Sequence, residues 1–566
     1  MSNSKISTLT LSITIIFLCI TARLFYLQIN LASYFIIRGE NNFLRKETTH
    51  STRGTIFDCN GLIMATNRPV LSLYWVGTGK TPMTEEQKEL LKSLEEILGT
   101  SILENESLYK KLCFQERTER RIKIATDLSL DQLSQIEEQI PHSPNLMLQT
   151  DFERYYPHGN SSSHILGYLK REIDCELFGK MGLEKILQDT LKCERGTALT
   201  TVNSFGKEIA STELKKARSG NDITTTIDLT IQKLCESVFS PEFSGTFIVM
   251  DPINGDIKAL VSQPTFDPSL FLNPMTQETW QEVQQKQPFM NRALNALYPP
   301  GSIFKLITAS AALEHNIIHE DDHFNCRGFY LFAKRKYWCA QKWGHGKLST
   351  RQAVAQSCNP FFFNIGKQID IDILADYAHR FGLGEPTNII LPEKSGIVPS
   401  RAWKKEQKGE RWWQGETLST AIGQSFLMVT PVQIIRMISS IFTGYLVKPR
   451  ILLTEPIETK TLQIKASTRS FLKSAMLMTV EEGTGQGVNP VKDIEIYAKT
   501  STAQNSDLQK RTLGRNFLEH GWFVGHFTYK NNQPLAFVIL LENVGSSKIP
   551  KRVAAKFLLG YKKLFS

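Results

Sequence analysis

The sequence predicts an α+β protein that one N-terminal helix anchors in a membrane. An apolar run opens the chain at residues 9–29, and β-rich runs with a helical interruption fill residues 30–220. In residues 221–566, strand candidates stand near both ends and helical segments lie between them. Strands that flank helices in this way imply one sheet assembled from distant segments. A chain of 566 residues also exceeds a single domain, so two or three are expected.

The composition places the chain among globular proteins. Hydrophobic residues make up 41% and charged residues 22% of the sequence, which excludes a disordered chain. The formal net charge of +10 favours contact with anionic lipid or an anionic polymer. No zinc-finger spacing or RNA-binding signature accompanies this charge, so no nucleic-acid partner is expected.

Nine cysteines are scattered along the chain, and none forms a Cys-x-x-Cys pair. This spacing argues against a zinc or thioredoxin-like site, so no metal or other cofactor is expected. The odd count also argues against a disulfide scaffold. Cys326 and Cys339 could still bridge within one loop in an oxidising compartment.

The N-terminal run is interpreted as an uncleaved membrane anchor at residues 9–29. Residues 9–22 carry no charge, and apolar residues continue past Arg23 to Ile29, which is just long enough to span a bilayer. A cleaved signal peptide is the alternative, but no small-x-small cleavage site follows. A lipoprotein signal ending at Cys19 is disfavoured by the bulky Leu18 before it. Residues 1–8 then form a short cytoplasmic tail, although the charge asymmetry across the run is weak.

Residues 30–220 are expected to form a β-rich module. Asn60-Gly61 is a hairpin signal between two β-rich runs. Leucines at helical spacing among Glu and Lys indicate a helical insertion at about residues 84–140. A different rhythm begins after residue 220, and the domain boundary is placed there.

The last domain, residues 221–566, holds most of the strand candidates. Residues 245–250 and 256–262 form a hairpin, and further β runs cover 494–503, 521–529 and 535–542. An apolar helix is expected at about 554–564. The turn Pro299-Pro300-Gly301 leads into a buried helix, which would place Ser302 in its first turn and Lys305 on the same face.

Ser302 and Lys305 have the chemistry of an activated nucleophile. A serine hydroxyl is a poor nucleophile until a base takes its proton, and a lysine one turn away can serve if burial keeps it neutral. The pattern alone is not specific. Ser-x-x-Lys also begins at Ser2, Ser107, Ser204 and Ser470, where a capped or solvated helix explains it.

Three short motifs follow one another in order: Ser302-x-x-Lys305, Ser357-Cys358-Asn359 and Lys499-Thr500-Ser501. Each is weak alone, because Ser-x-Asn also occurs at Ser143 and Ser219. The ordered set, with Lys-Thr-Gly as its third motif, is typical of penicillin-binding proteins and class A β-lactamases.

Along almost its whole length the chain resembles the class B penicillin-binding proteins, the monofunctional cell-wall D,D-transpeptidases. Besides the three motifs, the resemblance is carried by residues 23–28, 53–58, 154–159, 182–184, 251–252, 420–424, 430–431 and 483–485. It implies a penicillin-binding transpeptidase fold, in which a five-stranded antiparallel sheet has helices on both faces, preceded by a β-rich pedestal or dimerisation-type module. Residues 343–346 and 413–417 resemble the elongation type more than the division type.

The resemblance implies catalytic roles for five residues. Ser302 would attack the penultimate D-Ala carbonyl of a stem peptide, with Lys305 as general base. Ser357 would relay protons toward the leaving or entering amine. Asn359 would bind the substrate backbone and orient Lys305. Lys499 would hold Lys305 neutral and attract the substrate carboxylate.

Substrate binding is implied for Thr500, Ser501 and Thr502, with the Thr500 and Thr502 hydroxyls contacting the substrate carboxylate. The backbone N–H groups of Ser302 and Thr502 would form the oxyanion hole. A β-lactam would be trapped as the same acyl-enzyme, and no cofactor is implied.

The partners implied are peptidoglycan stem peptides, β-lactams as inhibitors, the membrane, and a SEDS-family polymerase with other cell-wall synthesis proteins. The implied location is the inner (cytoplasmic) membrane, with a single pass and the C-terminal domain in the periplasm.

Two positions depart from the family pattern, Ser501 and Ser425, where glycine is usual. Glycine at 501 lets the strand pass close to the nucleophile, so a serine there would crowd the site or add a hydrogen bond. The alternative function is therefore a catalytically weak scaffold that activates a SEDS-family polymerase. A β-lactam hydrolase or sensor is disfavoured, because a lone hydrolase domain needs no module of roughly 190 residues behind it.

Overall fold

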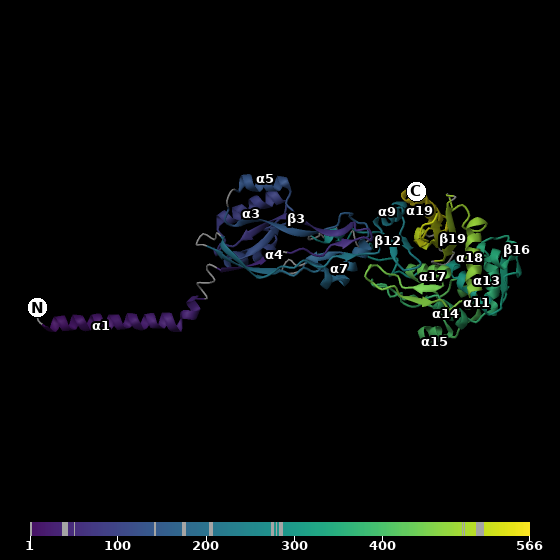
Figure 1. Ribbon diagram of the computed structural model, residues 1–566, viewed down its shortest axis with the longest axis horizontal. Helices are drawn as coiled ribbons and strands as arrows, with labels where there is room; N and C mark the ends of the chain where they lie inside the picture. Colours follow the sequence, from purple (N-terminus) through teal and green to yellow (C-terminus); the bar gives the residue numbers. More distant parts are fainter. Residues whose placement is uncertain are drawn as a thin grey trace. The chain divides into compact units, whose positions relative to one another are not determined.

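The computed structural model divides the chain into two compact units (Figure 1). It describes residues 3–36, 44–49, 51–140, 143–171, 177–202, 208–272, 277–278, 280–281, 287–489, 491, 493–504 and 514–566. Unit 1 comprises residues 1–54, 67–153 and 192–221, and unit 2 comprises residues 55–66, 154–191 and 222–566.

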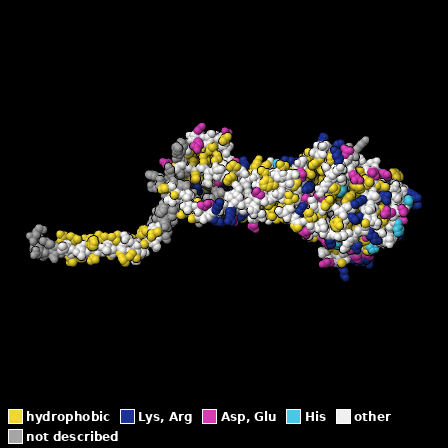
Figure 2. Space-filling view, in the orientation of Figure 1, with side chains coloured by type: hydrophobic (Ala, Val, Ile, Leu, Met, Phe, Trp, Pro, Cys, Tyr) yellow, Lys and Arg dark blue, Asp and Glu magenta, His cyan; other side chains and the backbone are white. Residues whose placement is uncertain are grey.

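The chain opens with helix α1 (Asn3–Phe25), which continues as one π-helical turn, η1 (Tyr26–Asn30). The apolar side chains of this segment are exposed, including Leu9 at 63% and Phe17 at 68% (Figure 2). Residues 8–30 are long and apolar enough to cross a membrane. This agrees with the anchor expected at 9–29. The helix already begins at Asn3, so residues 3–8 of the expected tail are helical, and residues 1–2 lie outside the described residues.

Unit 1 combines sheets with a group of helices. Strand β3 (Ile63–Val76), which begins in unit 2, pairs with β4 (Arg121–Ala125) and with β5 (Leu146–Tyr155). A separate sheet has the order β1 (Leu44–Thr49), β8 (Gly196–Val202), β9 (Glu208–Lys215). The segment expected to be a helical insertion contains α3 (Glu85–Leu98), α4 (Glu106–Arg117) and α5 (Leu130–Gln139), together with β4.

The ends of α3 show why this segment is helical. Thr84 and Gln87 form a reciprocal capping box at its start, and Gly99 ends it in the left-handed conformation at φ +63°. Its apolar stripe buries Leu91 and Leu94 completely. The small apolar core around Leu91 and Leu94 therefore follows from local sequence signals.

Unit 2 is built on a five-stranded antiparallel sheet with the order β12-β11-β21-β20-β19. Its strands are β11 (Gly245–Met250), β12 (Ile257–Gln263), β19 (Ile494–Ala503), β20 (His520–Tyr529) and β21 (Leu535–Leu541). The expected hairpin and the three expected late strands are confirmed. The expected penicillin-binding transpeptidase sheet, assembled from distant segments, is confirmed with them.

Both faces of this sheet are covered. Phe247 and Val249 of β11 lie in the core beneath α9 (Leu229–Val238) and α19 (Lys548–Phe565), whereas the alternate residues Ile248 and Met250 lie in the larger core on the other face. The latter face packs against α17 (Pro431–Thr443). Burial on both faces explains why β11 is a continuous apolar run instead of an alternating one.

The larger core contains the buried helix α11 (Lys305–Glu314) and the helices around it. Other helices of unit 2 are α6 (Ser163–Leu166), α7 (Gly182–Ile186), α8 (Gln188–Leu191), α12 (Thr350–Ala355), α13 (Asn359–Gln368), α14 (Ile371–Arg380), α15 (Arg401–Lys408), α16 (Gln414–Ala421) and α18 (Ala466–Glu481). Short strands pair as β13 (His323–Cys326) with β16 (Gly346–Ser349), β14 (Phe329–Phe332) with β15 (Arg335–Trp338), β17 (Tyr445–Val447) with β18 (Thr459–Thr461), β6 (Leu169–Arg171) with β7 (Leu177–Gly179), and β2 (Ile56–Phe57) with β10 (Ile223–Thr224) and the start of β3. The short 3-10 turns are η3 (Pro268–Phe271), η4 (Gly301–Ile303) and η6 (Arg515–Phe517).

Candidate active site

Ser302 lies in the 3-10 turn η4, directly before helix α11. The sequence placed it in the first turn of the helix itself. Gly301 has a φ of +53°, the next turn is 3-10, and the α-helix begins only at Lys305. Ser302 is partly buried, and its hydroxyl has no hydrogen-bond partner among the described residues. An unengaged hydroxyl at the start of a buried helix is available for reaction.

The turn that carries Ser302 is fixed by a second glycine turn. The Gly301 N–H donates a 2.9 Å hydrogen bond to the Gly423 carbonyl, and a Cβ on Gly423 would collide with the Gly301 backbone. Gly423 also has a φ of +76°. Ser425, two residues on, has a φ of +73°, a conformation that suits glycine and costs a serine on the order of 1 kcal/mol. This strain accounts for the preference for glycine at position 425.

Lys305 is completely buried and touches the second motif. Its Nζ donates to the Ser357 carbonyl at 2.9 Å, to the Ser357 hydroxyl at 3.1 Å and to Asn359 Oδ1 at 2.7 Å. The ammonium also lies 5.3 Å from the centre of the Phe362 ring. Three acceptors match the three N–H bonds of a protonated amine. The structure therefore joins three of the expected catalytic residues in one contact.

Burial lowers the pKa of Lys305 to about 8, while the thiols of Cys358 and Cys339 act in the opposite direction. With that pKa, roughly one tenth of Lys305 is neutral at pH 7. Burial also lowers the pKa of Lys499 well below its usual value, and the charge of Lys305 adds to this effect. Loss of hydration is the first cause for both lysines, and the expected contribution of Lys499 to keeping Lys305 neutral stays a prediction.

The second motif has a strained backbone. Ser357 has a φ of +56°, and helix α13 begins two residues later at Asn359. A non-glycine residue in this region costs of order 1–3 kcal/mol and persists where its surroundings enforce it. Here the Ser357 carbonyl accepts a hydrogen bond from Lys305, and Asn359 Nδ2 donates to the Trp338 carbonyl at 3.2 Å. The strain turns the side chains of both motif residues toward Lys305.

The third motif lies on β19, which ends the order of the described sheet. Lys499 is completely buried and its Nζ donates to the Thr500 carbonyl at 3.2 Å. Ser501 is 2% exposed, and its hydroxyl donates to the Pro300 carbonyl at 2.9 Å. The extra hydroxyl of this chain thus contacts the turn before Ser302.

The two threonines of this strand are engaged with other segments. The Thr500 hydroxyl lies 2.5 Å from the Thr484 hydroxyl, in the 483–485 loop, and the Thr502 hydroxyl accepts a 3.2 Å bond from the Ser547 N–H. No contact joins either hydroxyl to Lys305 or Ser302 among the described residues. Their expected role toward a substrate carboxylate stays a prediction.

A cluster of metal-ligating side chains adjoins the second motif. The sulfurs of Cys326, Cys339 and Cys358 and a ring nitrogen of His345 all lie within 4.8 Å of one another. A tetrahedral zinc ion with Zn–S bonds of about 2.3 Å separates its ligand atoms by about 3.8 Å, so the four donors fit such an ion. The three cysteines are buried free thiols, so the bridge that Cys326 and Cys339 could have formed is absent from the structure.

The protonation of the cluster also favours metal binding. Hydrogen bonding from Cys358, followed by that from His345, lowers the pKa of the Cys339 thiol to about 3 against the effect of burial. The pKa of Cys358 is raised by the same pair interaction. A lowered pKa favours the thiolate form of Cys339, and thiolate is the ligand form that zinc requires.

This cluster was not predicted from the sequence, because only closely spaced Cys-x-x-Cys pairs were considered. The ligands are 13, 6 and 13 residues apart, and Cys358 lies inside the Ser-x-Asn motif. The usable signal was three cysteines and one histidine within residues 326–358. That signal becomes specific only when the strands β13 and β16 bring Cys326 beside Gly346, next to His345.

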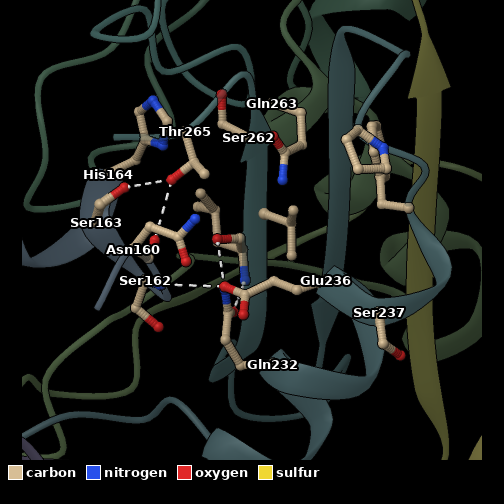
Figure 3. A pocket seen from close by; sticks show the side chains of 14 residues that line it. Asn160, Ser162, Ser163, His164, Gln232, Glu236, Ser237, Ser262, Gln263 and Thr265 are labelled. Carbon is tan, nitrogen blue, oxygen red and sulfur yellow. Dashed lines mark hydrogen bonds between the residues drawn. The ribbon is translucent and has the colours of Figure 1, made fainter. Parts of the chain in front are cut away.

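A separate polar cavity of about 300 Å³ also lies in unit 2 (Figure 3). His164 is among the residues that line it. His164 Nε2 lies 2.7 Å from the Pro288 carbonyl, and burial lowers its pKa to about 4. Glu236 Oε1 accepts bonds from the Ser162 N–H and Gln232, so this carboxylate too is held by its neighbours. The cavity has the character of a structural hydrogen-bond network.

Two protein-family models match the chain. The penicillin binding protein transpeptidase domain matches residues 245–559, and the penicillin-binding protein dimerisation domain matches residues 48–225. Together they cover both the sheet of unit 2 and the preceding module.

Similar proteins extend over nearly the whole length. The peptidoglycan D,D-transpeptidase MrdA of Acinetobacter baumannii is 27% identical, covering 94% of this chain and 83% of the relative. The protein of the same name from Escherichia coli K12 is 25% identical, covering 93% and 88%.

Two solved structures are also similar. One is the complex between a penicillin-binding protein (PBP2) and MreC from Helicobacter pylori, with a TM-score of 0.78, 26% identity, and coverage of 92% of this chain and 100% of the other. The second, described as structural coordination of polymerization and crosslinking by a peptidoglycan synthase complex, has a TM-score of 0.75 and 27% identity, and covers 99% and 98%.

Proposed function

Since this chain belongs to the class B penicillin-binding proteins, we propose that it is a peptidoglycan D,D-transpeptidase that cross-links stem peptides through an acyl-enzyme on Ser302. One observation carries the proposal. Lys305, one turn from Ser302, is buried and hydrogen-bonded to both Ser357 and Asn359. This is the arrangement that can accept a proton from a serine and pass it on.

In the acylation step, Ser302 Oγ attacks the carbonyl carbon of the penultimate D-Ala while its proton moves to neutral Lys305. The carbon–nitrogen bond to the terminal D-Ala then breaks. The departing amine takes the proton from Lys305 through the Ser357 hydroxyl, which lies 3.1 Å from Nζ. Terminal D-Ala leaves, and the peptide remains as an ester on Ser302.

In the second step, an amine from a neighbouring stem peptide attacks this ester. Ser357 and Lys305 accept the amine proton and return it to Ser302 Oγ as the ester bond breaks. A new amide cross-link forms and the enzyme is regenerated. A β-lactam enters the first step in the same way, and its ring-opened acyl group remains on Ser302.

The strand β19 supplies the substrate-binding side. As the last strand of the described sheet, it offers its backbone to an extended peptide, which would add to the sheet as a further strand. Lys499 would attract the substrate carboxylate, with Thr500, Ser501 and Thr502 alongside. The N–H groups of Ser302 and Thr502 would stabilise the oxyanion.

The N-terminal apolar helix supports a single-pass placement of the chain. Residues 1–8 would lie in the cytoplasm, 9–29 would cross the inner membrane once, and the domains at 30–220 and 221–566 would lie in the periplasm. The substrate, an uncross-linked cell-wall peptide, is found on that side. The similarity to a complex with MreC and to a peptidoglycan synthase complex supports partners of the elongation machinery, including a SEDS-family polymerase.

The four-donor cluster would hold a zinc ion through Cys326, Cys339, His345 and Cys358. Such an ion supplies a structural cross-link and takes no part in acyl transfer. The chain's own contribution is that Cys358 sits between Ser357 and Asn359, so the cluster fixes the peptide that holds both Lys305 partners.

Fluorescent penicillin tests this function. The detergent-solubilised full-length chain should give one covalently labelled band on a denaturing gel, and Ser302→Ala should give none. Labelling that survives Ser302→Ala would exclude this nucleophile. Rapid loss of the label from the wild type would instead indicate a hydrolase.

A second function is supported by the coverage of the synthase-complex structure, which includes 99% of this chain. The module at 30–220 would activate a glycan polymerase in the membrane, and both functions can coexist. A wild type that labels poorly but stimulates a SEDS-family polymerase would favour the scaffold.

A further inference from the structure

One stretch of unit 2 carries an unusual charge. Residues 327–347, called the cationic segment here, contain six Lys or Arg residues and no Asp or Glu. Asp and Glu make up 56 of the 566 residues of the whole chain, so about two acidic residues would be expected in a stretch of this length. The six cations are Arg327, Lys334, Arg335, Lys336, Lys342 and Lys347, and all six are exposed.

These cations have no carboxylate partners within the part of the chain that the structure describes. No described ion pair involves any of the six. The acids nearest in sequence precede strand β13, where Glu320 pairs with Arg351 and Asp322 accepts from the His319 N–H. Figure 2 shows Lys, Arg and His side chains at the edge of unit 2 where Figure 1 labels β16. A concentrated, unneutralised positive charge attracts anionic ligands.

Exposed aromatic side chains accompany the charge. Trp343 is 93% exposed and Trp338 is 58% exposed. The Lys336 ammonium lies 4.6 Å from the centre of the Phe329 ring and 5.8 Å from that of Trp338. Large aromatic faces left in water on a soluble domain mark a binding surface, and tryptophan dominates such surfaces energetically. Their flat faces suit sugar rings and peptide planes.

The cationic segment is fixed to the catalytic motif. Asn359 Nδ2 donates to the Trp338 carbonyl, and Tyr337 packs on Phe363 of α13 with ring centres 5.3 Å apart. The four-donor cluster adds Cys339 and His345, from within the segment, to Cys358 of the motif. A ligand bound to the cationic segment would therefore lie next to Ser357 and Asn359 of the candidate active site.

We propose that the cationic segment binds the carboxylate-bearing stem peptide of the strand that supplies the amine for cross-linking. This inference rests on the proposed transpeptidase function and adds where its second substrate docks. Stem peptides carry several carboxylates on a glycan backbone, which matches exposed cations interleaved with tryptophans. The first substrate is assigned to β19 and Lys499, so the second must approach from another side, and Ser357 is the proposed relay for its amine.

Binding of uncross-linked glycan strands with pentapeptide stems, labelled with a fluorophore, tests this proposal on the detergent-solubilised full-length chain. The test variant carries Lys334→Gln, Arg335→Gln, Lys336→Gln and Lys342→Gln. The matched control carries Lys548→Gln, Arg552→Gln, Lys556→Gln and Lys563→Gln on α19, which are four equally exposed cations on another face. Trp343→Ala tests the aromatic contribution separately.

We expect the test variant to bind strands about tenfold or more weakly, as loss of four exposed ion pairs predicts, and the control to bind within about twofold of the wild type. Raising the salt concentration should weaken strand binding by the wild type and reduce the difference in affinity between the wild type and the test variant. Both variants should react with fluorescent penicillin at the wild-type rate, because a β-lactam uses only the first-substrate side. Trp343→Ala should weaken strand binding severalfold.

Equal strand binding by the test and control variants would overturn the proposal. A second contradicting result is that the wild type binds phosphatidylglycerol vesicles, the test variant does not, and strand binding is the same in both. That result would assign the surface to a membrane. A parallel loss of penicillin labelling would also overturn it, because the segment would then support the nucleophile. If the proposed transpeptidase function is wrong but the docking surface is right, the results differ. Fluorescent penicillin then does not label the wild type, whereas strand binding still depends on the four cations.

Discussion

The Ser501 hydroxyl donates a 2.9 Å hydrogen bond to the Pro300 carbonyl, two residues before Ser302. The position is normally glycine in the resembling family, and a serine there raised the question of whether it would crowd the site. Its side chain is 2% exposed and its hydroxyl is satisfied by the backbone of the nucleophile turn. Ser501 therefore joins β19 to the turn that carries Ser302.

We predict that Ser501→Gly lowers stability more than it changes the reaction. The variant loses a buried hydrogen bond and adds a flexible residue to a strand, for a combined cost of about 1–2 kcal/mol in unfolding free energy. The rate of penicillin acylation should stay within about threefold of the wild type. Thermal unfolding and stopped-flow labelling measure the two effects. Ser501→Ala separates the hydroxyl from the glycine effect, and an acylation rate that rises more than about tenfold in Ser501→Gly would show that the serine obstructs the site.

The pH dependence of acylation should follow Lys305. Below its pKa of about 8 the group is an ammonium and cannot take a proton, so the rate should rise with pH, by about tenfold per unit well below that value, and level off above it. Lys305→Arg should be inactive at every pH, because guanidinium does not deprotonate. Labelling rates between pH 6 and 9.5 test this. A rate that is flat or falls from pH 6.5 to 8 would contradict the assignment of Lys305 as the base.

Asn359→Asp should move that profile to higher pH. The substitution keeps the size of the side chain but places a carboxylate at the 2.7 Å contact with Nζ, which stabilises the ammonium and raises the pKa of Lys305 by about one unit or more. Acylation at neutral pH should therefore fall, and recover in alkaline buffer. Asn364→Asp, elsewhere on α13, is the control and should leave the profile unchanged. An unshifted profile in Asn359→Asp would mean that Lys305 is not the group that titrates.

The purified protein should contain about one zinc ion per chain, held by the four-donor cluster. Elemental analysis by mass spectrometry measures the content, and Cys358→Ser and Cys339→Ser should each reduce it. A chelator should lower the unfolding temperature of the wild type, because a structural ion stabilises the fold that binds it. Cys113→Ser on α4 is the control and should retain the metal. Metal content that is equal in all of these variants would remove the cluster as the binding site.

Local signals in the sequence were sufficient for the sheet of unit 2. The continuous apolar runs at β11 and β21 and the turn between β11 and β12 predicted strands within one or two residues of those observed. The alternation of β11 residues between two cores could not be predicted, because it depends on α19, which comes some three hundred residues later. In the insertion, strand β4 was missed, since five partly exposed residues between two helices give no clear period.

In the candidate site too, local motifs could be predicted, whereas features that depend on distant segments could not. The order of the three motifs selected Ser302, Lys305, Ser357 and Asn359, and the fold brings the last three into hydrogen-bond contact. The 3-10 turn at Ser302 and the positive φ of Ser357 were not predictable, because both are enforced by distant segments such as the turn at Gly423. The cluster around Cys358 and the partner of Ser501 likewise depend on contacts between residues far apart in the chain.

Ser302 is the residue proposed to form the acyl-enzyme. The most direct measurement is intact-protein mass spectrometry of the full-length chain after incubation with a penicillin, followed by peptide mapping of the adduct. The proposed mechanism predicts a mass increase equal to one penicillin molecule, located on the peptide that contains Ser302 and absent in Ser302→Ala. An adduct on any other residue, or an unchanged adduct in Ser302→Ala, would contradict it.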